Sequence, residues 1–297
     1  MHEDLWTATR QTSLRLRAYD AADREAPAVV ALHGLVAGSD GIIDACGGED
    51  PFERLAGHGC HVLALDWPGH GRSGGRRGHL PYHLAMDAAA AAIDVAAQRW
   101  GCPVALLGAG LGGILAVYAA IEGRRVGAVV STSVLDLRDV APALGRTRRA
   151  ASLPLLGGVA SVLPDRAAAR VRVPLPAVIS SRDLVADPVR RRRLLRHPQA
   201  VRHATLDGLA STFASPQDKP DVRALPVPLL AAVGSEDRVV PVPAVRAFTA
   251  ALGSGASLWV LPGAGHDLLV GHPRTLLPGV AAFVRAQVRP AADAGGR

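Results

Sequence analysis

The 297-residue sequence predicts an α/β fold with a mostly parallel central sheet, helices on both faces and a helical cap inserted into the core. Two observations predict this fold. Short, wholly apolar segments alternate with helical segments along the chain, and glycine-rich turns follow several of the apolar segments. Wholly apolar segments of strand length are typical of parallel strands that are buried on both faces.

The first two segments differ from those that follow. They alternate polar and apolar residues, which predicts half-exposed antiparallel strands over Leu5–Arg10 and Ser13–Tyr19. The apolar strands are then expected at Ala28–Gly34, Cys60–Gly71, Pro103–Gly110, Val126–Ser133, Pro226–Asp237 and Ser257–His266. Helices are expected at Pro51–His58, Pro81–Trp100, Leu111–Glu122, Val242–Leu252 and Pro273–Val288. This alternation implies right-handed crossovers between parallel strands.

One interval interrupts the alternation. Between Asp136 and Leu225 there is no clear apolar strand, and the segments are rich in leucine and arginine. We therefore expect a first part of the core at 1–135, a mostly helical cap at 136–225 and a second part of the core at 226–288. The end of the chain, 289–297, has the composition of a disordered tail.

Composition narrows the class of protein. The formal charge of +7 comes almost wholly from arginine, Lys219 being the single lysine, which indicates the codon bias of a GC-rich genome. No motif for nucleic-acid binding occurs, so no nucleic-acid partner is expected. No apolar segment is long enough to span a bilayer, and no signal peptide is recognisable. With only three cysteines (Cys46, Cys60 and Cys102), a reduced, cytoplasmic protein is expected.

Chemically suggestive motifs follow the predicted strands. In open α/β sheets, ligands bind at the carboxyl ends of the strands, so these motifs are expected to meet at one site. In chain order they are His33-Gly34-Leu35, Asp66 to Ser73, Gly108-Ala109-Gly110-Leu111-Gly112, Gly234-Ser235-Glu236-Asp237 and Gly263-Ala264-Gly265-His266.

With these five motifs the chain resembles α/β-hydrolases of the lysophospholipase and monoacylglycerol lipase type, also described as serine aminopeptidase-like. The resemblance extends from about Pro27 to Gln287. It implies the α/β-hydrolase fold, hydrolysis of a carboxylic ester of a small or acyl-chain substrate, and no cofactor or metal.

The same resemblance assigns roles to individual residues. It implies that His266 is the general base and that Asp237 orients it, because an imidazole accepts a proton on one nitrogen when a carboxylate holds the other. Asp237 as a helix cap is the alternative, with Asp136 and Asp139 as substitute acids. The oxyanion hole would consist of the backbone N–H groups of Leu35 and Leu111.

The chain departs from the family at the nucleophile. The strand-to-helix turn that carries the catalytic serine in such enzymes has Gly110 at that position. Covalent ester hydrolysis is therefore predicted to be weak or absent. Substitution by another serine is disfavoured, because Ser131 and Ser133 end the next strand and Ser73 lies in the previous loop, away from the turn that places its residue beside the histidine. A natural glycine and one introduced to trap a substrate remain alternatives.

Three functions stay open at this stage. The first is a family member with little covalent ester hydrolysis. The second is an acid–base enzyme using His266 and Asp237 without a covalent intermediate, as a non-covalent hydrolase, a lyase or a cyclase. The third is a protein that binds a small ligand, such as an ester or acyl compound, without catalysis.

The arginine run Arg190–Arg193 is either a solvated helix face or a basic rim for anionic groups. Nothing in the sequence indicates an oligomeric state.

Overall fold

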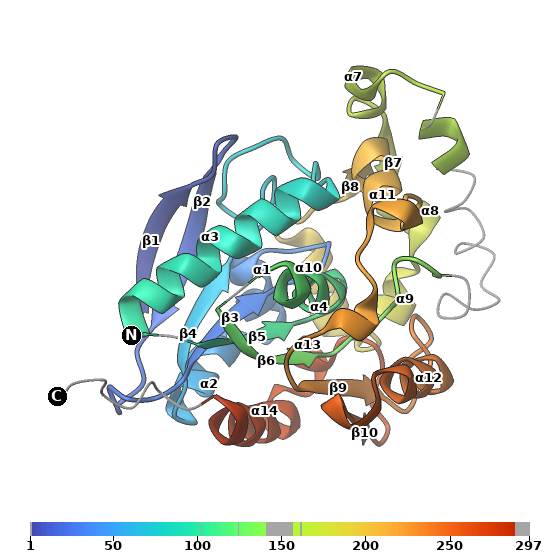
Figure 1. The fold of residues 1–297 in the computed structure, drawn as a ribbon. Coiled ribbons are helices and arrows are strands. Elements are labelled where there is room, and N and C mark those ends of the chain that lie inside the picture. Colours follow the sequence, from blue (N-terminus) through green and yellow to red (C-terminus); the bar gives the residue numbers. More distant parts are fainter. Residues whose placement is uncertain (1, 102, 124, 141–156, 161, 289–297) are drawn as a thin grey trace, which may run out of the picture.

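A twisted eight-stranded sheet forms the centre of the described part of the protein (Figure 1). The structure is a computed structural model that describes residues 2–101, 103–123, 125–140, 157–160 and 162–288. The predicted tail, 289–297, lies outside these residues. The strand order is β1-β2-β4-β3-β5-β6-β9-β10, and the six strands from β4 to β10 in that order are parallel. The prediction of a mostly parallel central sheet is confirmed.

The strands and helices lie close to the predicted segments. The strands of the main sheet are β1 (His2–Ala8), β2 (Ser13–Tyr19), β3 (Ala28–Leu32), β4 (His61–Leu65), β5 (Val104–Gly108), β6 (Val126–Ser131), β9 (Leu229–Gly234) and β10 (Ala256–Leu261). The main helices are α2 (Pro51–Gly57), α3 (Tyr82–Trp100), α4 (Leu111–Glu122), α12 (Val242–Leu252) and α14 (Pro273–Gln287). Two short helices were not predicted: α1 (Ser39–Ala45) and α13 (Leu268–Gly271).

Helices cover both faces of the sheet, as predicted. Successive side chains of a strand point to opposite faces, and in β3 Val30 packs in one apolar cluster while Val29 packs in the other. The first cluster contains residues of α3, α4 and α12, and the second contains residues of α2 and α14. The parallel strands are therefore buried on both sides, which explains why their sequences are apolar throughout.

The predicted half-exposure of the first hairpin is wrong for its second strand. β1 is largely exposed, but every residue of β2 after Ser13 is buried. Arg15 is fully buried because its guanidinium forms ion pairs with Asp4, Asp40 and Asp66. Arginine can occupy an interior position when its charge is paired in this way.

The insertion, by which we mean residues 136–225, contains short helices and two three-residue strands in its described part. β7 (Arg172–Pro174) and β8 (His203–Thr205) pair antiparallel. With three residues each, they are too short to give a recognisable apolar segment. The described helices of the insertion are α7 (Asp165–Ala168), α8 (Leu175–Val178), α9 (Ser181–Leu184), α10 (Pro188–Arg196), α11 (Leu206–Phe213) and the 3-10 turns at Pro216–Asp218 and Val222–Ala224. Among the residues described, no helix has both the length and the apolarity needed to cross a membrane.

Candidate active site

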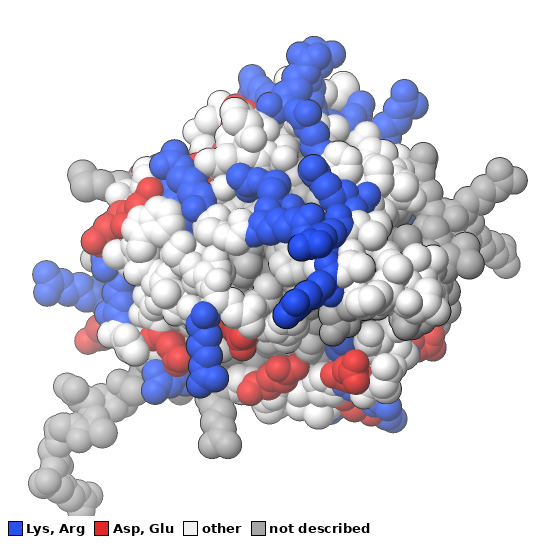
Figure 2. Space-filling view, turned by 90° about the horizontal axis from the view of Figure 1, so that it is seen from above, with Lys and Arg blue, Asp and Glu red and all other residues white. Residues whose placement is uncertain are grey.

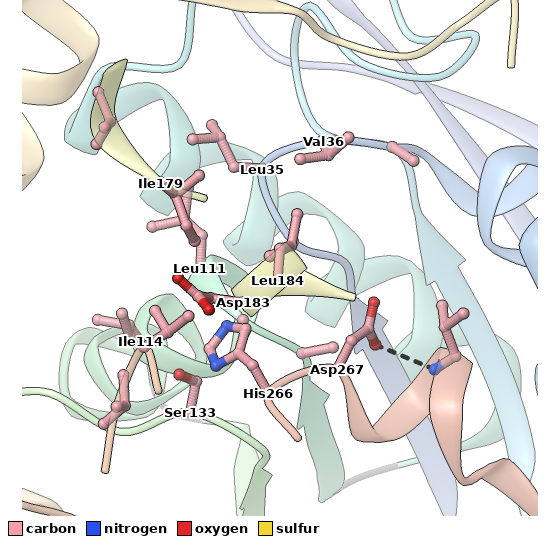
Figure 3. Close-up of a pocket in the computed structure, with 18 of the residues that line it drawn as sticks. Leu35, Val36, Leu111, Ile114, Ser133, Ile179, Asp183, Leu184, His266 and Asp267 are labelled. Atoms are coloured by element: carbon pink, nitrogen blue, oxygen red, sulfur yellow. Dashed lines mark hydrogen bonds between the residues drawn. The ribbon is translucent and has the colours of Figure 1, made fainter. Parts of the chain in front are cut away.

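A cavity of about 550 Å³ lies between the carboxyl ends of the parallel strands and the insertion. The core contributes residues from the loops that follow β3, β5, β6, β9 and β10, including His266, and the insertion contributes residues from α8 to α11 (Figure 3). Most of the lining side chains are apolar. Those from the insertion are Val178, Ile179, Ser180, Asp183, Leu184, Leu194, Leu209 and Phe213.

His266, which lines the cavity, is hydrogen-bonded to Asp237. Nδ1 of His266 lies 2.9 Å from Oδ2 of Asp237, and both side chains are buried. Oδ1 of Asp237 accepts hydrogen bonds from the backbone N–H groups of Val239 and Val240 at 2.7 and 2.9 Å. Asp237 thus also orders the turn before α12, as the alternative interpretation held. Because a carboxylate only accepts, Nδ1 carries the proton and Nε2 is left as the basic nitrogen.

Two opposing effects act on the His266 imidazole. Burial lowers its pKa, but the hydrogen bond to Asp237 and the negative charges of Asp237 and Asp267 outweigh burial and raise the pKa above its usual value. The site therefore stabilises the imidazolium that forms when His266 accepts a proton.

The substitute acids lie elsewhere. Asp136 accepts hydrogen bonds from the Tyr118 hydroxyl at 3.2 Å and from the Arg138 backbone N–H at 2.8 Å, and Asp139 is exposed. Neither lines the cavity.

Gly110 forms the sharp turn between β5 and α4. Its φ of 54° and ψ of −123° fall in a region that side chains rarely adopt. A Cβ atom built on Gly110 would lie 3.7 Å from Cα of Gly34 and 3.8 Å from Nε2 of His266. A side chain at this position would therefore fit the available space and would face the basic nitrogen.

The turn needs its flanking glycines for a different reason. A Cβ on Gly108 would lie 2.3 Å from the carbonyl oxygen of Gly112, and one on Gly112 would lie 2.1 Å from that of Leu32. This close approach of backbones brings the first turn of α4 against the end of β5.

The two predicted oxyanion donors lie in the same cavity wall. Leu35 follows β3 and Leu111 begins α4, and both line the cavity with Gly110. As the first residue of a helix, Leu111 has an amide N–H without a carbonyl partner inside that helix. The helix also directs the positive end of its dipole toward this point.

Of the three serines that could replace the nucleophile, two donate their hydroxyl hydrogen bonds to backbone carbonyls. Ser73 donates to the carbonyl of Asp66, and Ser131 donates to the carbonyl of Ser133 at 2.7 Å. Ser133 lines the cavity, and its buried hydroxyl has no hydrogen-bond partner among the described residues. No hydrogen bond joins it to His266 within that part of the chain.

The Asp66 to Ser73 segment does not line the cavity. Asp66 is fully buried and accepts hydrogen bonds from the backbone N–H groups of Ser39 and Arg72 at 2.7 and 3.0 Å and from Arg15 at 3.3 Å. These contacts hold β2, β4 and α1 together beside the site.

Sequence reasoning missed two carboxylates of the cavity. Asp267 is half-buried, and the partial loss of hydration raises its pKa. Its position directly after His266 was the available signal. Asp183 comes from α9 and makes no hydrogen bond or ion pair with the described residues. Figure 3 shows both in the cavity lining with His266. No sequence pattern pointed to Asp183, because it lies in the insertion and does not follow a predicted strand of the core.

The described residues include neither a reactive thiol nor a cluster of metal-binding side chains. Burial raises the pKa of Cys46 to about 12 and that of Cys60 to about 11, which keeps both protonated. Cys102 lies outside the described residues. Within those residues, no group of three or more His, Cys, Asp or Glu could hold a metal ion.

Positive charge is concentrated in the insertion. Residues 136–225 contain 16 Arg and Lys against eight Asp, whereas the rest of the chain has 17 basic and 18 acidic residues. Figure 2 shows basic side chains across the middle of one face and acidic ones nearer its lower edge.

Known proteins share this fold and this sequence pattern. The family model described as serine aminopeptidase, S33, matches residues 25–272. A monoacylglycerol lipase from Paleococcus ferrophilus has 21% identity and a TM-score of 0.72, with 92% of this chain and 99% of that chain covered. A soluble variant of the monoglyceride lipase of Saccharomyces cerevisiae has 14% identity and a TM-score of 0.77, with 97% and 95% covered.

A third similar structure is the α/β-hydrolase GrgF from Penicillium sp. sh18, with 18% identity, a TM-score of 0.74, and 97% of this chain and 99% of that chain covered. At these identities the similarity establishes the fold alone. No curated protein sequence matches the chain.

Proposed function

The chain belongs to the serine aminopeptidase S33 family, and we propose that within this family it hydrolyses a carboxylic ester by direct attack of water, with His266 as the general base. Gly110 occupies the position of the family's nucleophile in this proposal, so no covalent acyl-enzyme forms. Asp237 is the orienting acid, and the amide N–H groups of Leu35 and Leu111 form the oxyanion hole. The insertion, 136–225, is the cap over the site.

One observation carries the proposal. The Cβ position of Gly110 is 3.8 Å from Nε2 of His266, and Nδ1 of the same ring is hydrogen-bonded to Asp237. The space that a serine side chain would fill is therefore next to the basic nitrogen. A water molecule there can donate a hydrogen bond to Nε2, which is the geometry that general-base catalysis requires.

Hydrolysis then proceeds in two steps. The water oxygen attacks the ester carbonyl carbon while Nε2 of His266 takes a proton from that water. The carbonyl oxygen becomes an oxyanion that the amides of Leu35 and Leu111 stabilise. When the intermediate collapses, the bond between carbon and the alcohol oxygen breaks, and the alcohol oxygen takes the proton from Nε2. Asp237 keeps Nδ1 protonated throughout.

The cavity lining supports an apolar or acyl-bearing substrate. Leucine, isoleucine, valine and phenylalanine side chains from both the core and the insertion surround the space above Gly110. An acyl chain or a small apolar ester would bury its surface there, which is the main source of affinity in such pockets.

A direct test combines turnover with covalent trapping. We expect slow hydrolysis of nitrophenyl butyrate or a monoacylglycerol that a fluorophosphonate probe does not inhibit, because no serine takes part. A pre-steady-state burst, or probe labelling at Ser133, would show that hydrolysis proceeds through a covalent intermediate and not by direct attack of water. Ligand-induced thermal stabilisation without turnover of any ester would support the ligand-binding alternative instead.

A further inference from the structure

Two consecutive arginines of α10 donate hydrogen bonds to the backbone at the ends of two other short helices. Nη1 of Arg190 donates to the carbonyls of Val270 and Gly271, the latter at 3.1 Å. Nη1 of Arg191 donates to the carbonyls of Val185 and Ala186 at 2.9 and 3.0 Å. Val270 and Gly271 end α13, whereas Val185 and Ala186 directly follow α9. The run is therefore not a uniformly solvated helix face.

These two helices form parts of the cavity wall. α13 follows His266 and Asp267 directly and contributes Leu269 and Val270 to the lining, whereas α9 contributes Asp183 and Leu184. α10 itself contributes Leu194. Helix α10 of the insertion thus contacts two parts of the cavity wall. Arg190 binds the end of α13, next to His266, and Arg191 binds the segment that follows α9.

α13 depends on contacts at both of its ends. A four-residue helix has few internal hydrogen bonds and is not stable by itself. At its N-terminus, Oδ1 of Asp267 accepts from the N–H of Val270 at 3.0 Å (the dashed line in Figure 3), and at its C-terminus Arg190 binds the free carbonyls. A negative group at the N-terminus and a positive group at the C-terminus both match the helix dipole.

We propose that Arg190 is a positioning residue for His266, and that Arg191 positions the part of the cavity wall that α9 forms. Arg190 fixes the end of the segment that begins at His266, so it holds the imidazole in place over Gly110. Arg191 fixes the segment that carries Asp183 and Leu184, so it sets the shape of the space for the substrate. This inference rests on the proposed function only for the role of His266 as a base.

Arg192 provides a matched control. It belongs to the same run and the same helix, but it is exposed, and its side chain makes no hydrogen bond or ion pair with the residues that the structure describes. A change at Arg192 removes the same charge as a change at Arg190 or Arg191 without removing a contact to a cavity helix.

The charges around His266 provide a second, activity-independent readout. Asp237 is hydrogen-bonded to the ring, Asp267 adjoins it, and Asp183 and Arg238 line the same cavity. The hydrogen bond to Asp237 is the largest of the contributions that raise the pKa of His266. Because Arg190 holds the segment that begins at His266, removing it should weaken this hydrogen bond and lower the pKa of the imidazole.

The kinetic experiment compares Arg190→Gln, Arg191→Gln and Arg192→Gln in the full-length protein with short and long nitrophenyl esters. Arg190→Gln should lower kcat roughly 10- to 100-fold with little change in KM, because a misplaced base slows the chemical step. Arg191→Gln should mainly raise KM and alter the preference for acyl length. Arg192→Gln should match the parent protein, and Arg190→Lys should recover part of kcat.

NMR titration of the His266 imidazole gives the outcome that does not require turnover. Arg190→Gln should lower its pKa relative to Arg192→Gln, and Arg190→Lys, which keeps a donor for the end of α13, should lower it less. If no ester is hydrolysed by the parent protein, the proposed function fails, while this titration still tests whether Arg190 positions His266. Equal imidazole titrations, or equal kinetic effects, for the Gln variants at 190 and 192 would overturn the inference. If Arg190→Gln does not fold, Arg190→Lys should still have a lower kcat than Arg192→Gln, and an equal kcat for these two variants would overturn the inference.

Discussion

His266 and Asp237 are 29 residues apart in the sequence, yet Nδ1 of the imidazole lies 2.9 Å from Oδ2 of the carboxylate. The contact follows from the sheet. β9 and β10 are parallel neighbours whose last residues, Gly234 and Leu261, are paired in register. The loops that follow them therefore start side by side, and each needs only a few residues to bring Asp237 and His266 into contact.

Removing either member of this pair should abolish or severely reduce ester hydrolysis. His266→Ala should lower kcat by about 10²–10⁴-fold, the usual contribution of a general base. Asp237→Asn should also reduce kcat, because an amide can hold the ring in the wrong tautomer. Steady-state kinetics with nitrophenyl butyrate checks both, with Asp136→Asn as the control that should retain activity. Turnover that persists in both variants at the parent rate would place the chemistry outside the His266–Asp237 pair.

The pH dependence should show the state of the same imidazole. Because the hydrogen bond and the charges of Asp237 and Asp267 raise the pKa of His266 above 6.5 despite burial, the neutral base forms only at higher pH. Turnover should therefore rise with pH, with a midpoint above 6.5. In Asp237→Asn the main cause of the rise in pKa is removed, burial dominates, and any residual activity should have its midpoint at lower pH. Profiles of kcat/KM against pH for both proteins measure this difference, and coincident midpoints would contradict it.

Asp66 should stabilise the fold rather than take part in catalysis. Burial opposes its ionisation, but His33, Arg15 and two backbone N–H groups outweigh burial and lower its pKa below 3.8. A lowered pKa in the folded state means that the stabilisation is present above the unfolded-state pKa and is lost as the pH falls toward the folded-state value.

Asp66→Asn should therefore destabilise the protein by about 3 kcal/mol at neutral pH, the lower end of the range for a broken buried pair. Arg15 keeps its contacts with Asp4 and Asp40, which limits the loss. Urea denaturation measures the free energy of unfolding, and Asp87→Asn, a change at an exposed side chain of α3 that makes no ion pair with the described residues, should leave it unchanged. Equal stabilities for the two variants would show that the Asp66 contacts contribute nothing net.

The positions of His266, Asp237 and Gly110 could be predicted because they follow buried parallel strands. Such strands are wholly apolar, so their ends are visible in the sequence, and the carboxyl ends of parallel strands meet at one edge of a sheet. Examples are the strand that ends at Gly108, two residues before Gly110, and the strand that ends at Gly234, three residues before Asp237.

The burial of β2 could not be predicted in the same way. Arg15 and Arg17 made the segment appear polar on one side, and their partners Asp4, Asp40 and Asp66 lie in three other segments. Charge pairing between distant segments leaves no periodic pattern in one strand. For the same reason the sequence placed Arg190 and Arg191 in a charged run but gave no sign of the backbone carbonyls that they bind.

The last prediction concerns Gly110. Gly110→Ser adds a hydroxyl where a Cβ would lie 3.8 Å from Nε2 of His266 and 3.7 Å from Cα of Gly34, so the side chain fits without displacing a neighbour. His266, Asp237 and the amides of Leu35 and Leu111 are in place around it. We expect the variant to hydrolyse nitrophenyl acetate or butyrate far faster than the parent protein, because a nucleophile held beside its base avoids the cost of ordering a water molecule. A fluorophosphonate probe should label residue 110.

The same change should lower stability, because the φ of 54° at this turn is unfavourable for a residue with a side chain. The cost should be about 1–3 kcal/mol. Gly110→Ala is the matched control: it should show the same loss in urea denaturation without any gain in turnover or labelling, since it adds the strain but not the oxygen. Adding His266→Ala to Gly110→Ser should remove the gained activity. A Gly110→Ser protein that folds and binds an ester, but neither reacts with the probe nor turns the ester over, would mean that the surrounding groups do not form a hydrolytic site, and a ligand-binding function would then explain the cavity better.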